Sequence, residues 1–143
     1  MSAPDPATFG FAETVQRQFD FLLEHGFARV FTSPTKVRYE SKKVYIEISR
    51  SDWDGEVAIS FGRLKEKEEF SFTLFLRLVD STLERTLGER LAYNADQVRH
   101  CVVGLANALK SRGWPIISGQ DWIFERMKNL RWWDFQPDAL KDT

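Results

Sequence analysis

Residues 43–63 read KVYIEISRSDWDGEVAISFGR and contain two alternating segments on either side of a turn. In each segment every second residue is apolar, and a period of two is typical of antiparallel strands that bury one face. We therefore predict strands at Lys43–Arg50 and Glu56–Arg63, joined by a turn at residues 52–55. The side chains that share the predicted buried face are Val44, Ile46, Ile48, Val57, Ile59 and Phe61.

Three neighbouring segments extend this hairpin into a sheet. Ala28–Thr32 and Lys36–Glu40 are short alternating runs separated by the turn signal Ser33-Pro34-Thr35. After the charged loop 65–68, Glu69–Leu76 alternates again, and we expect its Phe70 and Phe72 to be buried. The pattern predicts a meander of about five strands, with Tyr45, Glu47 and Ser60 on the opposite, polar face.

Helical periodicity flanks the predicted strands on both sides. Apolar residues between Phe11 and Leu23 fall on one stripe, and His25-Gly26 ends that helix. Leu76–Leu87 is ambiguous and is expected to change from strand to helix near Val79. A further helix starts at a cap formed by Asn94 or Asp96, and a capping box of Ser118 and Asp121 predicts a last helix through about Arg131. The fold class is therefore α+β: a single antiparallel sheet with an N-terminal helix and two or three C-terminal helices packed on one face.

The composition fits one domain over residues 1–143. The chain has 143 residues, of which 43% are hydrophobic and 29% charged, with a net charge of −1. We expect residues 1–8 and 137–143 to be flexible ends. A near-neutral chain is not held to nucleic acid by its global field. The sequence shows no secretory signal, no apolar run of membrane-spanning length and one cysteine, Cys101, so we expect a cytoplasmic location.

Motifs that carry chemistry are absent from the sequence. The glycines form no phosphate-binding loop, and no nucleophile elbow or zinc-protease motif occurs. Asp96 and His100 are spaced to share a helix face and could supply two metal ligands, but no pattern nominates a third. Cys101 lies on the apolar stripe of its helix, where a structural role is expected. We therefore predict a non-enzymatic protein with no catalytic, cofactor-binding or metal-binding residues.

Charge is distributed in blocks along the chain. Residues 29–50 carry six basic and two acidic side chains, whereas residues 51–70 carry three basic and six acidic ones. An aromatic residue between acids at a turn can anchor a protein contact. We therefore predict a partner-binding surface, and the alternatives are that Trp53 folds back over the sheet edge and that the blocks pair across the sheet. The predicted surface comprises Asp52, Trp53, Asp54, Glu56, Glu66, Glu68 and Glu69.

A second aromatic group falls near the C-terminus. On an extended last helix, Trp122, Arg126 and Trp133 would share a side away from Ile123 and Met127. Two tryptophans beside an arginine are typical of interface hot spots. The alternative is that residues 131–135 leave the helix and pack their rings into the core.

Two other function classes stay open from the sequence. The polar sheet face could form a cup for a small ligand or regulator, lined by Tyr45, Ser49, Ser60 and Thr73. The basic block 29–50 could bind nucleic acid, with Tyr39 or Tyr45 stacking on bases. The oligomeric state is open as well.

The N-terminal half resembles a group of small bacterial proteins. The residues that carry the resemblance are the run Phe19–Phe27, the segment Val37–Ser41 and the segment Val44–Ile48. Some proteins of that kind are thought to be immunity partners of secreted polymorphic toxins. The resemblance thus implies a protein-binding inhibitor whose partner is a cognate toxin, and it carries over no binding residues.

Overall fold

The two alternating segments of residues 43–63 form the centre of the sheet. They are strands β3 (Val44–Arg50) and β4 (Val57–Arg63), and they pair antiparallel with Ile46 opposite Phe61 and Ile48 opposite Ile59. All four of these side chains are buried, as predicted. The computed structural model describes residues 8–130, and every structural statement below concerns this part of the chain.

Three further strands complete an antiparallel meander in the order β1-β2-β3-β4-β5. β1 (Ala28–Ser33) and β2 (Lys36–Glu40) lie on one side of the central hairpin, and β5 (Phe70–Ser71) lies on the other. β1 is an edge strand, and its pairing with β2 shifts register between Arg29 and Phe31. Such a bulge twists the edge and hinders pairing with another chain.

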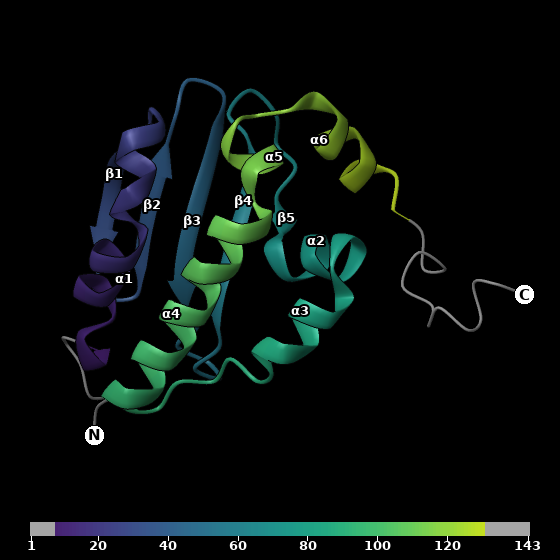
Figure 1. Ribbon diagram of the computed structural model, residues 1–143. Coiled ribbons are helices and arrows are strands. Elements are labelled where there is room, and N and C mark those ends of the chain that lie inside the picture. Colours follow the sequence, from purple (N-terminus) through teal and green to yellow (C-terminus); the bar gives the residue numbers. More distant parts are fainter. Residues whose placement is uncertain (1–7, 131–143) are drawn as a thin grey trace, which may run out of the picture.

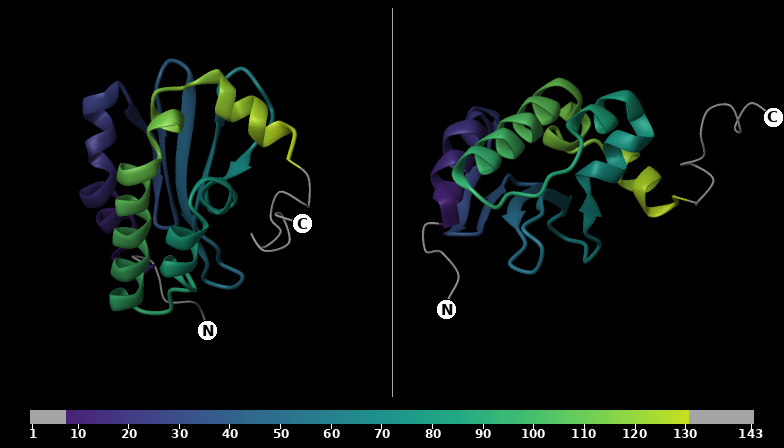
Figure 2. Two further views of the ribbon diagram at one scale, coloured as in Figure 1. Left: turned by 45° about the vertical axis from the view of Figure 1, so that its right-hand side comes forward. Right: turned by 90° about the horizontal axis from the view of Figure 1, so that it is seen from below.

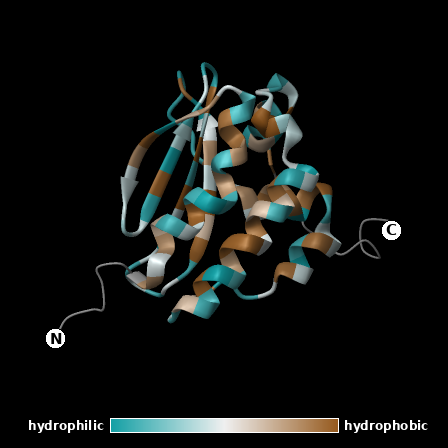
Figure 3. Cartoon of the chain, turned by 60° about the vertical axis from the view of Figure 1, so that its left-hand side comes forward, coloured by the Kyte–Doolittle hydropathy of each residue, from teal (hydrophilic) through white to brown (hydrophobic). Residues whose placement is uncertain are grey.

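Helices cover one face of the sheet, and the other face is bare (Figures 1 and 2). Apolar segments occur both in the strands and in the helices that cover them (Figure 3). No helix within residues 8–130 has the length and apolar character needed to cross a membrane. The α-helices are α1 (Phe11–Phe19), α2 (Phe72–Val79), α3 (Ser81–Leu87), α4 (Ala95–Arg112), α5 (Trp114–Ile117) and α6 (Asp121–Lys128), and the 3₁₀-helices are η1 (Thr8–Gly10) and η2 (Asp20–His25).

The prediction of a strand over Glu69–Leu76 is wrong beyond Ser71. Ser71 caps α2 instead, because its Oγ accepts a hydrogen bond from the backbone N–H of Leu74 at 3.3 Å. Phe72, Phe75 and Leu76 are buried from one face of this helix. Phe72 is therefore in the core as predicted, but it reaches the core from a helix, and Phe70 is only half-buried.

Other predicted helix boundaries also change. The first helix is α-helical only to Phe19 and continues as a 3₁₀-helix to His25, where Gly26 adopts a left-handed φ of 87°. The predicted capping box is wrong, because the Ser118 hydroxyl donates to the carbonyl of Trp114 at 2.7 Å. Gln120 occupies the cap of α6, but its side chain accepts no hydrogen bond from a backbone N–H of the helix, and α6 ends at Lys128, before the predicted Arg131.

Side chains on the bare sheet face pack against one another. Arg38 pairs with Glu40 at 2.8 Å and with Glu47 at 3.3 Å, and its guanidinium lies 4.0 Å from the centre of the Tyr45 ring. Tyr45 points to this face as predicted, yet it is buried, because Arg38 lies against its ring and the neighbouring residue Gly62 leaves space for it.

Candidate functional site

The turn between β3 and β4, residues 51–56, is here called the Trp53 turn, and its own hydrogen bonds fix its conformation. Ser51 and Glu56 close it with a backbone bond of 2.9 Å, and Gly55 donates to the Ser51 carbonyl at 2.9 Å. The Ser51 hydroxyl accepts from the N–H of Trp53 at 3.1 Å, and the Asp54 carboxylate accepts from the N–H of Glu56 at 3.0 Å. Gly55 has a left-handed φ of 76°, which favours glycine at this position.

The segment before α4 holds the Trp53 turn from one side. The Tyr93 hydroxyl donates to the Asp54 carbonyl at 2.7 Å, and the N–H of Ala92 donates to the Gly55 carbonyl at 2.9 Å. Arg50, at the end of β3, donates from its Nε to the Ala92 carbonyl at 2.9 Å. The turn is thus joined to the rest of the molecule by residues about 40 positions away in the chain.

Trp53 is 93% exposed, so it does not fold back over the sheet edge. Tyr93, which contacts the same turn, is 55% exposed. Asp52, Asp54 and Glu56 are exposed too, and they make no ion pair with any described residue. The result is an aromatic side chain projecting from a rigid turn, with three unpaired carboxylates around it.

The other three predicted partner-binding acids lie at the opposite end of the sheet. Glu66, Glu68 and Glu69 belong to the loop between β4 and β5, and the seven residues of β4 separate this loop from the Trp53 turn (Figure 1). The seven residues predicted as one partner-binding surface therefore do not form a single patch. Glu66 is also engaged within the fold, since its carboxylate lies 3.0 Å from Arg63 Nε and 3.1 Å from Lys128 Nζ.

The second predicted surface is only partly within the described residues. Trp122 is 54% exposed on α6, and its Nε1 donates to the Gln120 side chain at 2.6 Å. Ile123 and Met127 are buried on the other side of the same helix, as the spacing predicted. Trp133 and the segment 131–135 lie outside the described residues.

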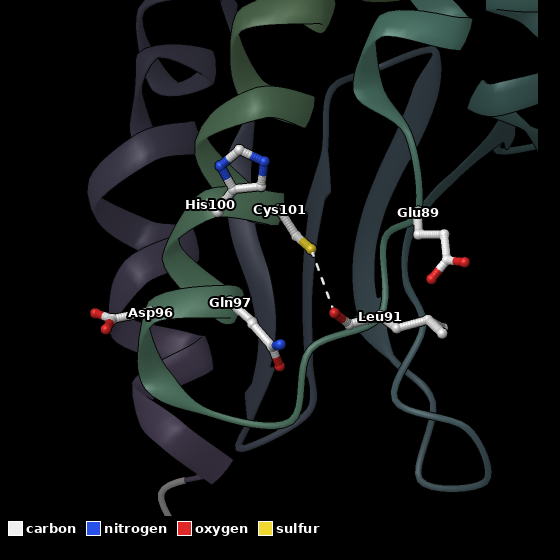
Figure 4. A pocket seen from close by; sticks show the side chains of 6 residues that line it. All are labelled: Glu89, Leu91, Asp96, Gln97, His100 and Cys101. Carbon is white, nitrogen blue, oxygen red and sulfur yellow. Dashed lines mark hydrogen bonds between the residues drawn. The ribbon is translucent and has the colours of Figure 1, made fainter.

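A pocket of about 340 Å³ lies between the N-terminal half of α4 and the segment before it. Figure 4 shows the side chains that line it. The Cys101 thiol points towards the Leu91 carbonyl at 4.0 Å, while Asp96 points away from the other labelled side chains (Figure 4). Cys101 is buried as predicted, and burial raises the pKa of its thiol. Within residues 8–130, no group of three or more histidine, cysteine or acidic side chains could hold a metal ion.

The tyrosines proposed to stack on bases cannot do so. The Tyr39 ring is fully buried, its hydroxyl donates to Asp20 at 2.8 Å, and burial raises its pKa. Tyr45 is 8% exposed beneath Arg38. The predicted ligand-binding cup on the polar sheet face loses one of its four residues, because Thr73 lies on α2 and not on the sheet.

Tyr93 is a site residue that the sequence analysis missed. Its contact with Asp54 spans 39 positions, and no local pattern marks it. The sequence feature that comes closest to placing Tyr93 is the next residue, Asn94, which was predicted as a helix cap. Its side chain accepts a hydrogen bond from the N–H of Gln97 at 2.8 Å and so fixes where α4 begins.

Comparison with known proteins gives no match to a family model, to a curated protein or to a solved structure.

Proposed function

We propose that this chain is a non-enzymatic protein-binding module that contacts its partner through the Trp53 turn. The observation that carries the proposal is the 93% exposure of a tryptophan on a turn that the fold holds rigid. Burying a tryptophan removes about 150–250 Å² from water, which at about 25 cal/mol per Å² corresponds to roughly 4–6 kcal/mol before the costs of association. A tryptophan in this position is a strong candidate for the centre of an interface.

The rigidity of the turn supports the same proposal. A flexible loop loses conformational entropy when it binds, and this loss reduces affinity. The backbone bonds from Ser51 and the contacts from Ala92 and Tyr93 hold the Trp53 turn before any partner arrives. Little ordering is therefore required of its backbone on binding.

The charges around Trp53 indicate the chemistry of the partner. Asp52, Asp54 and Glu56 are exposed and unpaired within the described residues, so they project a negative field around the aromatic anchor. Such a field speeds encounter with a basic surface and slows encounter with an acidic one. The partner is therefore a protein with a basic surface and a pocket for an indole ring.

The inhibitor class implied by the N-terminal resemblance fits this partner. A toxin that acts on nucleic acid needs a cationic site, and an acidic turn would both find that site and cover it. The encounter would take place in the cytoplasm, where Cys101 stays reduced.

Site-specific photo-crosslinking in cells tests the proposal. Trp53→p-benzoylphenylalanine should capture a defined protein on irradiation, whereas Trp122→p-benzoylphenylalanine, at another exposed tryptophan, should not capture it. The captured protein should bind the purified parent chain. Crosslinks to that protein from position 122 alone, or none from position 53, would contradict the proposal.

A further inference from the structure

A pocket of about 370 Å³ opens at the end of the sheet that lies farthest from the Trp53 turn. Three connections meet there: the turn between β2 and β3, the loop between β4 and β5, and the link between α5 and α6 (Figure 1). Six charged side chains line it, four basic and two acidic: Lys42, Lys43, Arg63, Lys65, Glu66 and Asp121.

Arg63 forms a fixed part of the pocket wall. Its guanidinium lies 2.6 Å from Glu125, 3.0 Å from Glu66 and 3.3 Å from Asp121, and it packs 5.2 Å from the centre of the Phe124 ring. Three carboxylates around one guanidinium leave this arginine little capacity for a further anion. The charge available to a ligand must therefore come from other residues.

The three lysines supply that charge. Lys42, Lys43 and Lys65 are exposed, and none of them makes an ion pair with a described residue. The stem of Lys43 packs against Gly119, where a Cβ atom would lie 3.0 Å from the lysine Cδ. Lys42 and Lys43 come from one connection and Lys65 from another, so two connections bring lysines without a described carboxylate partner to the lining of one pocket.

We propose that this pocket binds a small phosphorylated molecule, with its phosphate monoester held by Lys42, Lys43 and Lys65. These lysines carry three positive charges that no described carboxylate pairs, which is enough to balance a phosphate dianion. Lysine binds phosphate as a point charge and needs no fixed angle. The volume lies within the range of small-molecule sites, so it holds an organic group in addition to the phosphate.

The surroundings favour a small ligand over a nucleic acid. Asp121 at the rim has an 88% exposed side chain, Glu125 beside it is 57% exposed, and Glu68 and Glu69 in the adjoining loop are exposed. An extended phosphate backbone leaving the pocket would pass these carboxylates, and like charges repel. A compact ligand with one phosphate avoids them. This inference is independent of the proposed function, because the two sites lie at opposite ends of β4.

Titrating the ¹⁵N-labelled full chain at constant ionic strength tests the proposal, with adenosine 5′-monophosphate as the probe. We expect saturable amide shifts in residues 42–44, 63–66 and 119–121, similar shifts with inorganic phosphate, and none with adenosine. The double variant Lys42→Gln, Lys65→Gln should weaken binding about tenfold, which is about 0.7 kcal/mol for each lysine. Lys67→Gln is the matched control, because it removes a charge from the same loop outside the lining, and it should change binding by less than about twofold.

Three results would overturn the proposal. One is the absence of saturable shifts with both phosphate-bearing probes. Another is an equal loss of binding in Lys67→Gln, which would mean that diffuse charge, and not the pocket, attracts the anion. The third is tighter binding of a single-stranded oligodeoxynucleotide than of the monophosphate, since the acidic rim should exclude it.

Discussion

Gly62 shows how one residue permits the packing of the bare sheet face. It lies directly across from Tyr45 in the pairing of β3 with β4. A Cβ atom at this position would lie 2.6 Å from the Glu68 carbonyl oxygen and 2.9 Å from the Tyr45 ring. Both distances are shorter than van der Waals contact, so only glycine lets the ring and the loop approach the strand so closely.

We expect Gly62→Ala to lower the free energy of unfolding by about 1–3 kcal/mol, because the ring and the loop must both move. Gly104→Ala in α4 is the control, since its new methyl group would meet only the end of the Leu87 side chain at 3.3 Å. There, removing a helical glycine should stabilise the protein by up to about 1 kcal/mol. Urea unfolding of both variants checks the pair, and equal effects would show that Gly62 has no special packing role.

At the scale of the elements, the ladder of the central strands follows directly from local pattern, and the start of α2 does not. The apolar residues at 70, 72, 74 and 76 alternate, but Phe72, Phe75 and Leu76 also have helical spacing. Phenylalanine and leucine suit either structure, so the periodicity alone cannot decide between them. The signal that could have decided it is Ser71, a good N-cap that directly precedes the helix.

Ion pairs around Arg63 join β4, the loop that follows it, and α6. Hydrogen bonding from Lys128 and then from Arg63 lowers the pKa of Glu66 below the ordinary value of 4.5, and a bond from Arg63 lowers that of Glu125. A carboxyl whose pKa is lower in the folded state stabilises the fold above pH 4.5. That contribution is lost as the pH falls through the folded-state pKa.

Glu66→Gln should therefore lower stability at pH 6 and have a smaller effect near pH 3. The stability difference between the two pH values should shrink relative to the parent chain. Urea unfolding midpoints at the two pH values measure this change, with Glu68→Gln, an exposed acid of the same loop, as the control. A parent-like pH dependence in Glu66→Gln would contradict the assignment of this network as the source.

At the scale of the whole molecule, the meander places an acidic turn with an exposed tryptophan at one end of the sheet and a lysine-lined pocket at the other. Successive connections of a meander lie at opposite ends of the sheet, so the turn at 51–56 and the loop at 64–69 cannot form one surface. This separation follows from the predicted strands alone. The seven acidic-surface residues were nevertheless predicted as one surface because they are close in the sequence. The contact between Tyr93 and the Trp53 turn does not follow from the predicted strands, because it depends on where α4 packs.

The acids of the Trp53 turn should control how fast the partner is found. Asp52→Asn with Asp54→Asn should slow association and flatten its dependence on ionic strength, while dissociation changes little. Neutralising Glu68 and Glu69 in the same way removes two acids at the far end of the sheet and should leave association unchanged. Stopped-flow association at several salt concentrations gives the comparison, and equal slopes for the parent and the Asp52/Asp54 variant would contradict the electrostatic account.

The dissociation rate of the complex with the crosslinked partner tests the role of Trp53 most directly. Trp53→Ala should raise this rate by about 30-fold or more, which corresponds to about 2 kcal/mol at a hot spot, and should change association much less. Trp122→Ala should dissociate like the parent chain. A folded Trp53→Ala variant that binds the partner as tightly and dissociates as slowly as the parent would contradict the account.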